Sequence, residues 1–344
     1  MKWFFGENCA LDFSSGSPTA MSNSSMNKDE GCASISDANG NLLFYTSGIN
    51  AWNRNNLQMP NGFGLTGHNS ATQSALIIPK PGSNNLFYIF TVDAFLGSNG
   101  FRYSIVDMSQ QGGYGDITTK NVLILSPVAE KLTAVKHANN TDYWVIVHKG
   151  TTNAYYAYLV SSNGISTSPV ISNTGTTPVG NASEIGYLHA SPDGTRLASA
   201  IYGMSLFDLL DFNNTTGIVS NPISSPASYP DLYGIEFSPD GSKLYISSDK
   251  NLYQFNLLAG SASAIFSSAT LVGSSTTQYI GAIKLAVDNK LYFTTFFNTN
   301  LGVINNPNNL GTACNFNENG VYLGGQHCYA GLPNLIKWVT PQPD

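Results

Sequence analysis

The sequence predicts an all-β fold, a seven-bladed β-propeller whose blades are four-stranded antiparallel sheets. Three observations predict it: a hairpin phrase recurs along the chain, no long stretch has helical spacing of its apolar residues, and both chain ends hold incomplete sets of strands. The chain has 344 residues, more than one ordinary domain, but repetitive all-β folds often form a single unit of this size.

The clearest copies of the repeat are two hairpins at residues 186–198 and 234–246. In each, two apolar runs meet at Ser-Pro-Asp-Gly, where proline supplies a fixed φ and glycine supplies a positive one. Looser copies turn at residues 37–40 and 287–290. Neighbouring copies lie roughly 45 residues apart, which is the period of a propeller blade.

Each repeat marks one blade, and blades one to six are predicted at about 31–62, 73–126, 131–172, 185–224, 232–273 and 279–324. Residues 2–24 contain strands that lack an inner partner, whereas residues 329–339 form one inner strand with nothing after it. Pairing of these ends completes a seventh blade and leaves no sheet edge open. A single propeller over 1–339 is therefore predicted, with 340–344 as the start of a linker.

Composition argues against several classes of partner. The net charge is −6, only 10% of residues are charged, and no basic run is present, which disfavours nucleic acid and anionic membrane surfaces. No apolar run approaches the roughly 20 residues that span a bilayer. The first residues are too short for a signal peptide, and we expect that a leader has been removed. A surface rich in Asn, Ser and Thr is typical of a secreted protein.

Four cysteines allow three disulfide pairings. Cys314 and Cys328 are the closest pair in sequence and are the predicted disulfide. The alternative is four buried thiols, because a free cysteine packs as a small hydrophobic residue.

Several segments resemble the propeller region of large surface proteins of gliding Bacteroidota, and the resemblance covers almost the whole chain. The segments are 3–6, 11–13, 30–37, 40–46, 72–75, 88–93, 130–137 and 331–334. Such proteins usually continue into PKD-like repeats and a C-terminal sorting domain used by the type IX secretion system. The resemblance implies export and a role connected with gliding motility, but it supplies no activity residue by residue.

Ligands of propellers usually meet the face where the inner strands begin, so residues just before those strands are the candidate site. They are Glu30, Gln73, Glu130, Lys131, Glu184, Tyr233, Tyr279 and Tyr329, joined by His68 from the loop that enters blade two. Three carboxylates at equivalent positions could bind a polyhydroxyl ligand or calcium, which takes six to eight oxygen ligands. The structural alternative is that each glutamate caps its own strand or pairs with Lys131.

Aromatic residues give a second signal. Trp52, Phe95, Tyr202 and Phe297 fall near loops on the same predicted face, where exposed rings could stack on sugars, although most aromatic rings are expected to pack between blades. The aspartates of the hairpin turns are explained by turn geometry. No zinc spacing, nucleophile elbow or dinucleotide fingerprint is present.

These observations favour a secreted or cell-surface binding or adhesion module, monomeric within a longer chain, which recognises a glycan or a protein. No resident cofactor is expected, although calcium is possible. One alternative is a carbohydrate-active hydrolase or lyase with Glu130 and Glu184 as acid and base. Another is a scaffold that binds no ligand and separates neighbouring domains.

Overall fold

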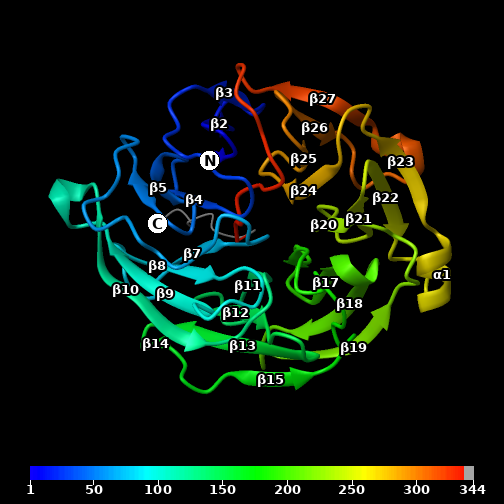
Figure 1. The fold of residues 1–344 in the computed structure, drawn as a ribbon, viewed down its shortest axis with the longest axis horizontal. Helices are drawn as coiled ribbons and strands as arrows, with labels where there is room; N and C mark the ends of the chain where they lie inside the picture. Colours follow the sequence, from blue (N-terminus) through cyan, green and yellow to red (C-terminus); the bar gives the residue numbers. More distant parts are fainter. Residues whose placement is uncertain (337–344) are drawn as a thin grey trace.

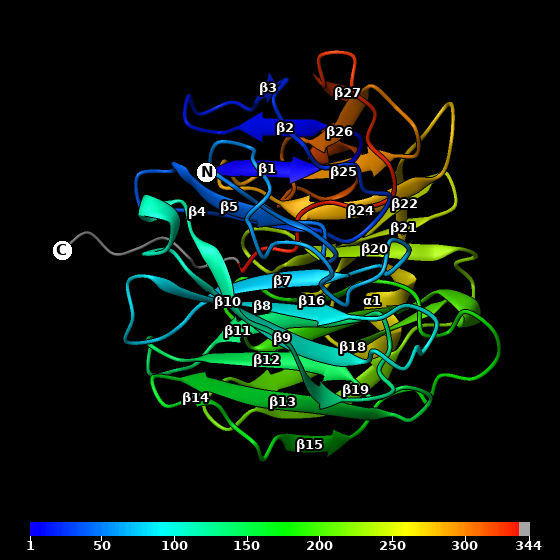
Figure 2. The ribbon, with the colours of Figure 1, turned by 60° about the vertical axis from the view of Figure 1, so that its left-hand side comes forward.

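The structure, a computed structural model, describes residues 1–336 and confirms the seven-bladed, all-β propeller. Figure 1 shows the blades arranged around a circle, with the first and last segments of the chain side by side. Figure 2 shows the inner strands of successive blades stacked along the same direction. The end of the expected C-terminal strand, including Trp338, and the predicted linker at 340–344 lie outside the described residues.

Blades one to three follow the predicted order. Blade one has three strands, β4 (Ala33–Ser36), β5 (Leu42–Thr46) and β6 (Ala51–Asn53). Blade two has β7 (Ala75–Pro79), β8 (Leu86–Val92), β9 (Phe101–Asp107) and β10 (Asp116–Leu125), with the short helix η1 (Gln111–Gly113). Blade three has β11 (Leu132–Lys136), β12 (Tyr143–His148) and β13 (Ala154–Ser161), and both β14 (Gly164–Ile165) and β15 (Val170–Asn173) pair with β13.

Blades four to six are regular four-stranded sheets. Blade four has β16 (Leu188–Ala190), β17 (Arg196–Ile201), β18 (Leu206–Asn213) and β19 (Ile218–Ser224), with η2 (Tyr202–Met204). Blade five has β20 (Leu232–Phe237), β21 (Lys243–Ser248), β22 (Asn251–Asn256) and β23 (Thr270–Ser274), with α1 (Ala262–Ser267) before the last strand. Blade six has β24 (Ile280–Leu285), β25 (Leu291–Thr295), β26 (Asn300–Ile304) and β27 (Phe316–Tyr322), with η3 (Gly311–Cys314).

The Ser-Pro-Asp-Gly turns form as their residue types require. The Ser238 hydroxyl accepts the Lys243 N–H at 2.9 Å and donates to the Asp240 carboxylate at 2.7 Å, while Gly241 has φ 70°. The same bonds recur in blade four, where Asp193 also accepts the Thr195 N–H at 3.1 Å. The aspartates therefore serve the turns, as turn geometry predicts.

The ends of the chain meet in blade seven. Its sheet contains β1 (Lys2–Phe5), β2 (Cys9–Asp12) and β3 (Thr19–Met21), and Glu7 forms a β-bridge with His327. The innermost position holds residues 330–336, which hydrogen-bond to blade six at Ala282 and to blade one at Asp29 and Cys32. This segment was predicted as a strand, but residues 330–336 make one isolated parallel bridge instead, between Pro333 and Cys32. Pro333 lacks the N–H that a continuous ladder needs.

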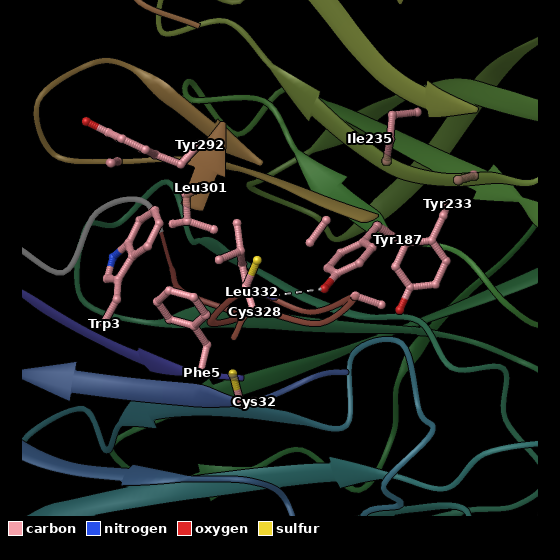
Figure 3. Packing of buried hydrophobic residues seen from close by; sticks show 14 of the residues in the cluster. Trp3, Phe5, Cys32, Tyr187, Tyr233, Ile235, Tyr292, Leu301, Cys328 and Leu332 are labelled. Atoms are coloured by element: carbon pink, nitrogen blue, oxygen red, sulfur yellow. Dashed lines mark hydrogen bonds between the residues drawn. The ribbon is translucent and has the colours of Figure 1, made fainter. Parts of the chain in front are cut away.

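Aromatic rings fill the spaces between blades. Trp3 of blade seven lies 4.8 Å from the Phe13 ring centroid and 5.9 Å from Tyr292 of blade six, as Figure 3 shows for Trp3 and Tyr292. Phe44 and Phe87 join blades one and two with ring centroids 5.6 Å apart. Large rings thus pack between neighbouring blades, as expected for inter-blade contacts.

The predicted disulfide is wrong in this structure, because all four cysteines are free and buried. Cys314 contributes its backbone carbonyl to Asn306, just beyond the end of β26, whereas Cys328 Sγ lies 3.6 Å from the carbonyl of Asn300, where β26 begins. A five-residue strand spans roughly 13–17 Å, while the Cα atoms of a disulfide lie within about 7 Å. Closeness in sequence did not reflect closeness in space.

Candidate functional site

The propeller has two faces, distinguished by the loops that they carry. We call the face where the inner strands begin the strand-start face, and the opposite face, which carries the hairpin turns after those strands, the turn face. The candidate ligand-binding residues were predicted for the strand-start face.

Hydrogen bonds join the starts of neighbouring inner strands in a circle, which we call the start ring. Six of these bonds join backbone groups, and in each pair the first residue donates its N–H to the carbonyl of the second. The pairs are Gly31–Ala71, Gln73–Glu130, Glu130–Glu184, Tyr187–Tyr233, Ala282–Ala330 and Ala330–Asp29. Between blades five and six, the Ser247 hydroxyl accepts the Gly234 N–H and donates to the Gly281 carbonyl, both at 2.8 Å. All seven blades are therefore linked in order.

Glycine at the strand starts permits this close approach. A Cβ on Gly234 would lie 2.4 Å from the Gly281 carbonyl oxygen, and one on Gly331 would lie 2.1 Å from that of Glu30. Real Cβ contacts are never so short, so any other residue would push neighbouring blades apart. The recurrence of glycine at these positions is visible in the sequence, but the close approach of neighbouring blades that requires it is not.

Polar side chains fill the centre of the start ring. Gln73, fully buried, accepts the N–H groups of Leu132 at 3.2 Å and Leu188 at 2.8 Å, and so crosses from blade two to blade four. Tyr187 Oη accepts the Leu332 N–H at 3.5 Å, the contact drawn as a dashed line in Figure 3. Gln73 is thus brought to the predicted centre, where it holds blades together.

Glu130 is fully buried, and its carboxylate accepts hydrogen bonds from residues of blade two. One carboxylate oxygen accepts the N–H and the hydroxyl of Thr72, both at 2.9 Å, and the other accepts the Phe95 N–H at 3.1 Å. Burial raises the pKa of Glu130 above its usual value. Both oxygens are occupied, so Glu130 has no access to a substrate and does not suit the role of general acid or base.

Lys131 does not pair with a glutamate, as the structural alternative had supposed. Its ammonium donates to the carbonyls of Ile185 at 2.8 Å, Gly186 at 2.9 Å and Ala200 at 2.7 Å. Burial lowers its pKa to about 7, with the nearby Glu130 carboxyl acting in the opposite direction. Lys131 therefore ties blade three to blade four by hydrogen bonds to neutral carbonyls.

Glu30 and Tyr233 each place a polar atom at the centre that does not reach water. No well-formed hydrogen bond from residues 1–336 reaches Glu30 Oε2 or Tyr233 Oη, although Tyr233 lies close enough to act on the pKa of Glu30. Burial, followed by repulsion from Glu130, raises the pKa of Glu30 to about 8. Burial also raises the pKa of Tyr233 well above its usual value. These groups mark the polar core of the start ring.

Glu184 and His68 lie farther out. Glu184 contributes its backbone carbonyl to the start ring, while its side chain is half-buried. His68 accepts the Ser70 N–H at Nδ1, 3.0 Å away, and its ring lies 5.7 Å from the Phe95 ring. Both residues belong to the predicted face, where the His68 ring packs against the Phe95 ring.

Two phenylalanines project from the strand-start face. Phe95 and Phe297 are 59% and 54% exposed, in corresponding loops of blades two and six. Both have left-handed backbones, with φ 54° and 53°, a conformation that is strained for bulky residues. Phe297 stacks on His327 with ring centroids 4.2 Å apart and planes 1° apart. We call Phe95, Phe297, Tyr329 beside Phe297, and Tyr279 beside Phe296 the aromatic rim.

The other predicted aromatic residues divide between the rim and the core. Tyr279, 39% exposed, stacks on Phe296 at 4.8 Å, and Tyr329 lies 5.7 Å from Phe297. Trp52 is buried and stacks on Tyr45 at 5.3 Å, so the expectation that it offers an exposed ring is wrong. The short β6 carries Trp52 into the sheet, where core packing decides its orientation.

A cavity lies on the other face. It has a volume of about 520 Å³, opens on the turn face beside the inner strands of blades three and four, and is lined by residues 133–138 and 189–194 with Asn140, Asn214, Lys284 of blade six and Leu335 of blade seven. The sequence analysis did not identify it. The only available signal was that two hairpin turns, at 137–142 and 191–196, follow neighbouring inner strands.

Calcium does not fit the predicted ring of carboxylates. Among residues 1–336, no group of three or more His, Cys, Asp or Glu side chains is placed to hold a metal ion. Calcium takes six to eight oxygens, but both oxygens of Glu130 are already occupied by protein donors. Within the described part of the chain, no helix is long and apolar enough to cross a membrane.

Comparison with known proteins supports the fold alone. No family model and no curated protein matches the sequence. A protein from Lactobacillus plantarum is 15% identical, with a TM-score of 0.61 over 96% of this chain and 98% of that chain. Hydrazine synthase from Kuenenia stuttgartiensis is 12% identical, with a TM-score of 0.51 over 81% of this chain and 77% of that chain. Both likenesses concern the arrangement of the blades.

Proposed function

We propose that the protein is a secreted or cell-surface binding and adhesion module that recognises a glycan through the aromatic rim of its strand-start face. The observation that carries this proposal is the exposure of Phe95 and Phe297 in strained backbone conformations. Strained residues persist only where their surroundings hold them, and they gather at functional sites. Exposed, fixed aromatic faces suit stacking on sugar rings.

The rim is held in place before any ligand arrives. The Phe95 N–H donates to Glu130, which is itself fixed by Thr72, and the Phe297 ring is stacked on His327. Holding the rings in place reduces the entropy lost on binding. The predicted central residues therefore act mainly as supports, and the rings above them make the contact.

The geometry disfavours the enzymatic alternative. The start ring is filled by side chains such as Gln73, and the buried Glu130 cannot reach a glycosidic bond. Exposed aromatic rings instead suit a glycan that is bound at the surface. Export and surface display rest on the resemblance to surface proteins of gliding Bacteroidota and on the low content of charged residues.

A glycan array combined with a hydrolysis assay tests the proposal. We expect saturable binding without turnover, weakened about three- to tenfold by Phe95→Ala or Phe297→Ala, since a stacked ring contributes roughly 0.5–1.5 kcal/mol. Phe63→Ala is the matched control, because Phe63 is also 56% exposed but stands outside the rim. Turnover would favour the enzyme, binding only to proteins would favour a protein ligand, and no response would favour the scaffold.

A further inference from the structure

We propose that the aromatic rim selects a glycan whose sugars carry a protonated amino group, and that it discriminates against acidic glycans. The inference rests on the proposed glycan site and names the class of sugar that this site prefers. Aromatic rings beside carboxylates suit an amino sugar for two reasons. The apolar face of the sugar stacks on a ring, and the ammonium group is attracted by both the ring face and the carboxylates.

Five rings of blades six and seven contact one another in a row on the strand-start face. Tyr279 stacks on Phe296 with ring centroids 4.8 Å apart, and Phe296 meets Tyr329 edge to face at 5.4 Å. Tyr329 lies 5.7 Å from Phe297, which stacks in turn on His327. Tyr279 and Phe297 are 39% and 54% exposed, so the row offers ring surface to a ligand.

Carboxylates lie beside the His327 end of this row. The Glu7 carboxylate is 3.3 Å from Nδ1 of His327, the ring on which Phe297 stacks. Burial, followed by Glu7 and Asp29, raises the pKa of Tyr329. The Asp29 carboxylate is exposed and accepts no hydrogen bond within residues 1–336, whereas its backbone carbonyl belongs to the start ring. Asp29 is therefore open to a ligand that lies on Tyr329.

The Tyr279 end of the row has carboxylates of its own. Burial, followed by Glu30 and Tyr202, raises the pKa of Tyr279 to about 12. Tyr202 of blade four extends the aromatic surface, and burial, followed by Asp231 and Asp249, raises the pKa of Tyr202 to about 12 as well. Asp231 and Asp249 are both exposed. Negative charge thus follows the rings from blade seven to blade four.

Two ammonium groups of the described chain lie near these rings, and both are engaged. Lys28 is 1% exposed and donates to the His68 carbonyl at 2.6 Å, while Lys250 donates to the Thr277 carbonyl at 2.8 Å. The exposed carboxylates beside the rings are those of Asp29, Asp231 and Asp249, in addition to Glu7, which faces His327. Carboxylates therefore outnumber ammonium groups, which attracts a cationic sugar and repels an anionic one.

A polar group under Tyr279 points to a cation independently of this balance. Glu30 Oε2 and Tyr233 Oη receive no well-formed hydrogen bond from residues 1–336, and Tyr233 is only 7% exposed. A buried carboxyl group without donors is costly to ionise, and a positive charge nearby reduces that cost. An ammonium group placed against Tyr279 supplies this charge, because Tyr279 is within reach of Glu30.

Calorimetric titration of the full chain with three oligosaccharides of equal length tests the inference. They are a glucosamine oligomer, its N-acetylated form and a galacturonate oligomer, at a slightly acidic pH where the amino groups are protonated. We expect the glucosamine oligomer to bind about three- to tenfold more tightly than the N-acetylated form, and the galacturonate oligomer to bind most weakly. Added salt should reduce the advantage of the amino form, because the attraction is electrostatic.

Asp29→Asn isolates the effect of charge, because it keeps the size of the side chain and the backbone carbonyl. It should reduce the preference for the glucosamine oligomer about threefold and leave binding of the N-acetylated form unchanged. Asp211→Asn is the matched control. Asp211 is also exposed, but it lies near the turn-face end of β18, where it accepts from the Asn221 amide at 3.0 Å. This control should leave the binding of both oligomers unchanged.

The inference and the proposed glycan site fail in different ways. Equal binding of the amino and N-acetylated oligomers, or equal effects of the two aspartate substitutions, would overturn the inference and leave the glycan site standing. A lysine tripeptide that binds as tightly as the glucosamine oligomer would show a site for any ammonium group and overturn the choice of an amino sugar. If no oligomer binds, the proposed glycan site fails, and the inference fails with it.

Discussion

Replacing Glu130 with Gln tests whether the buried carboxylate is a structural support. Its two oxygens accept three hydrogen bonds, two from Thr72 and one from the Phe95 N–H, with no water in reach. Glutamine keeps the size but presents an N–H₂ group to at least one of these donors. A buried donor without an acceptor costs about 1–3 kcal/mol, so the free energy of unfolding should fall by at least that amount.

Urea unfolding followed by circular dichroism measures this loss as a lower midpoint at unchanged slope. Glu184→Gln is the control, because the Glu184 side chain is half-buried and its ring contact uses the backbone carbonyl. We expect a change within about 0.5 kcal/mol there. If Glu130→Gln were as stable as the parent protein while abolishing a hydrolytic activity, Glu130 would be catalytic and the structural reasoning would fail.

Three further predictions follow from the same geometry. Gly331→Ala should lower the urea midpoint strongly, because the new Cβ would lie 2.1 Å from the Glu30 carbonyl oxygen; an unchanged midpoint would contradict the tight start ring. The pKa of Glu30 is raised from 4.5 to about 8 in the folded protein, so the free energy of unfolding should fall as the pH rises from 4.5 to 8. The fall is at most about 1.4 kcal/mol per pH unit, and Glu30→Gln should make the free energy of unfolding less dependent on pH in this range. Denatured, unreduced protein should titrate as four thiols; two thiols would show that one disulfide forms and contradict four free cysteines.

The architecture was predictable because its signals are local and repeated. The Ser-Pro-Asp-Gly turns specify hairpins through the fixed φ of proline, the positive φ of glycine and the aspartate acceptor, and each of these acts within a few residues. The shared seventh blade followed from counting strands at the two ends. The short helix α1 (Ala262–Ser267) was not predicted, because six residues, fewer than two turns, are too few to show a helical periodicity.

The site was less predictable, because burial depends on contacts between distant blades. The position of Glu130 before an inner strand indicated the strand-start face correctly, but its partners Thr72 and Phe95 come from another blade. The disulfide prediction failed because Cys314 and Cys328, although close in sequence, lie at opposite ends of β26. The turn-face cavity was missed because its walls come from blades three, four, six and seven, and no single segment carries the pattern.

Hydrogen exchange, resolved to short peptides by mass spectrometry, tests the closure of the ring most directly. The N–H groups of Ala330 and Gly331 both donate to Asp29, and that of Asn334 donates to Cys32. These amides should exchange only with global unfolding, as slowly as those of Gln73 and Glu130 within the start ring. Fast exchange at Ala330, Gly331 and Asn334, with Gln73 and Glu130 still protected, would show an open ring and contradict the account.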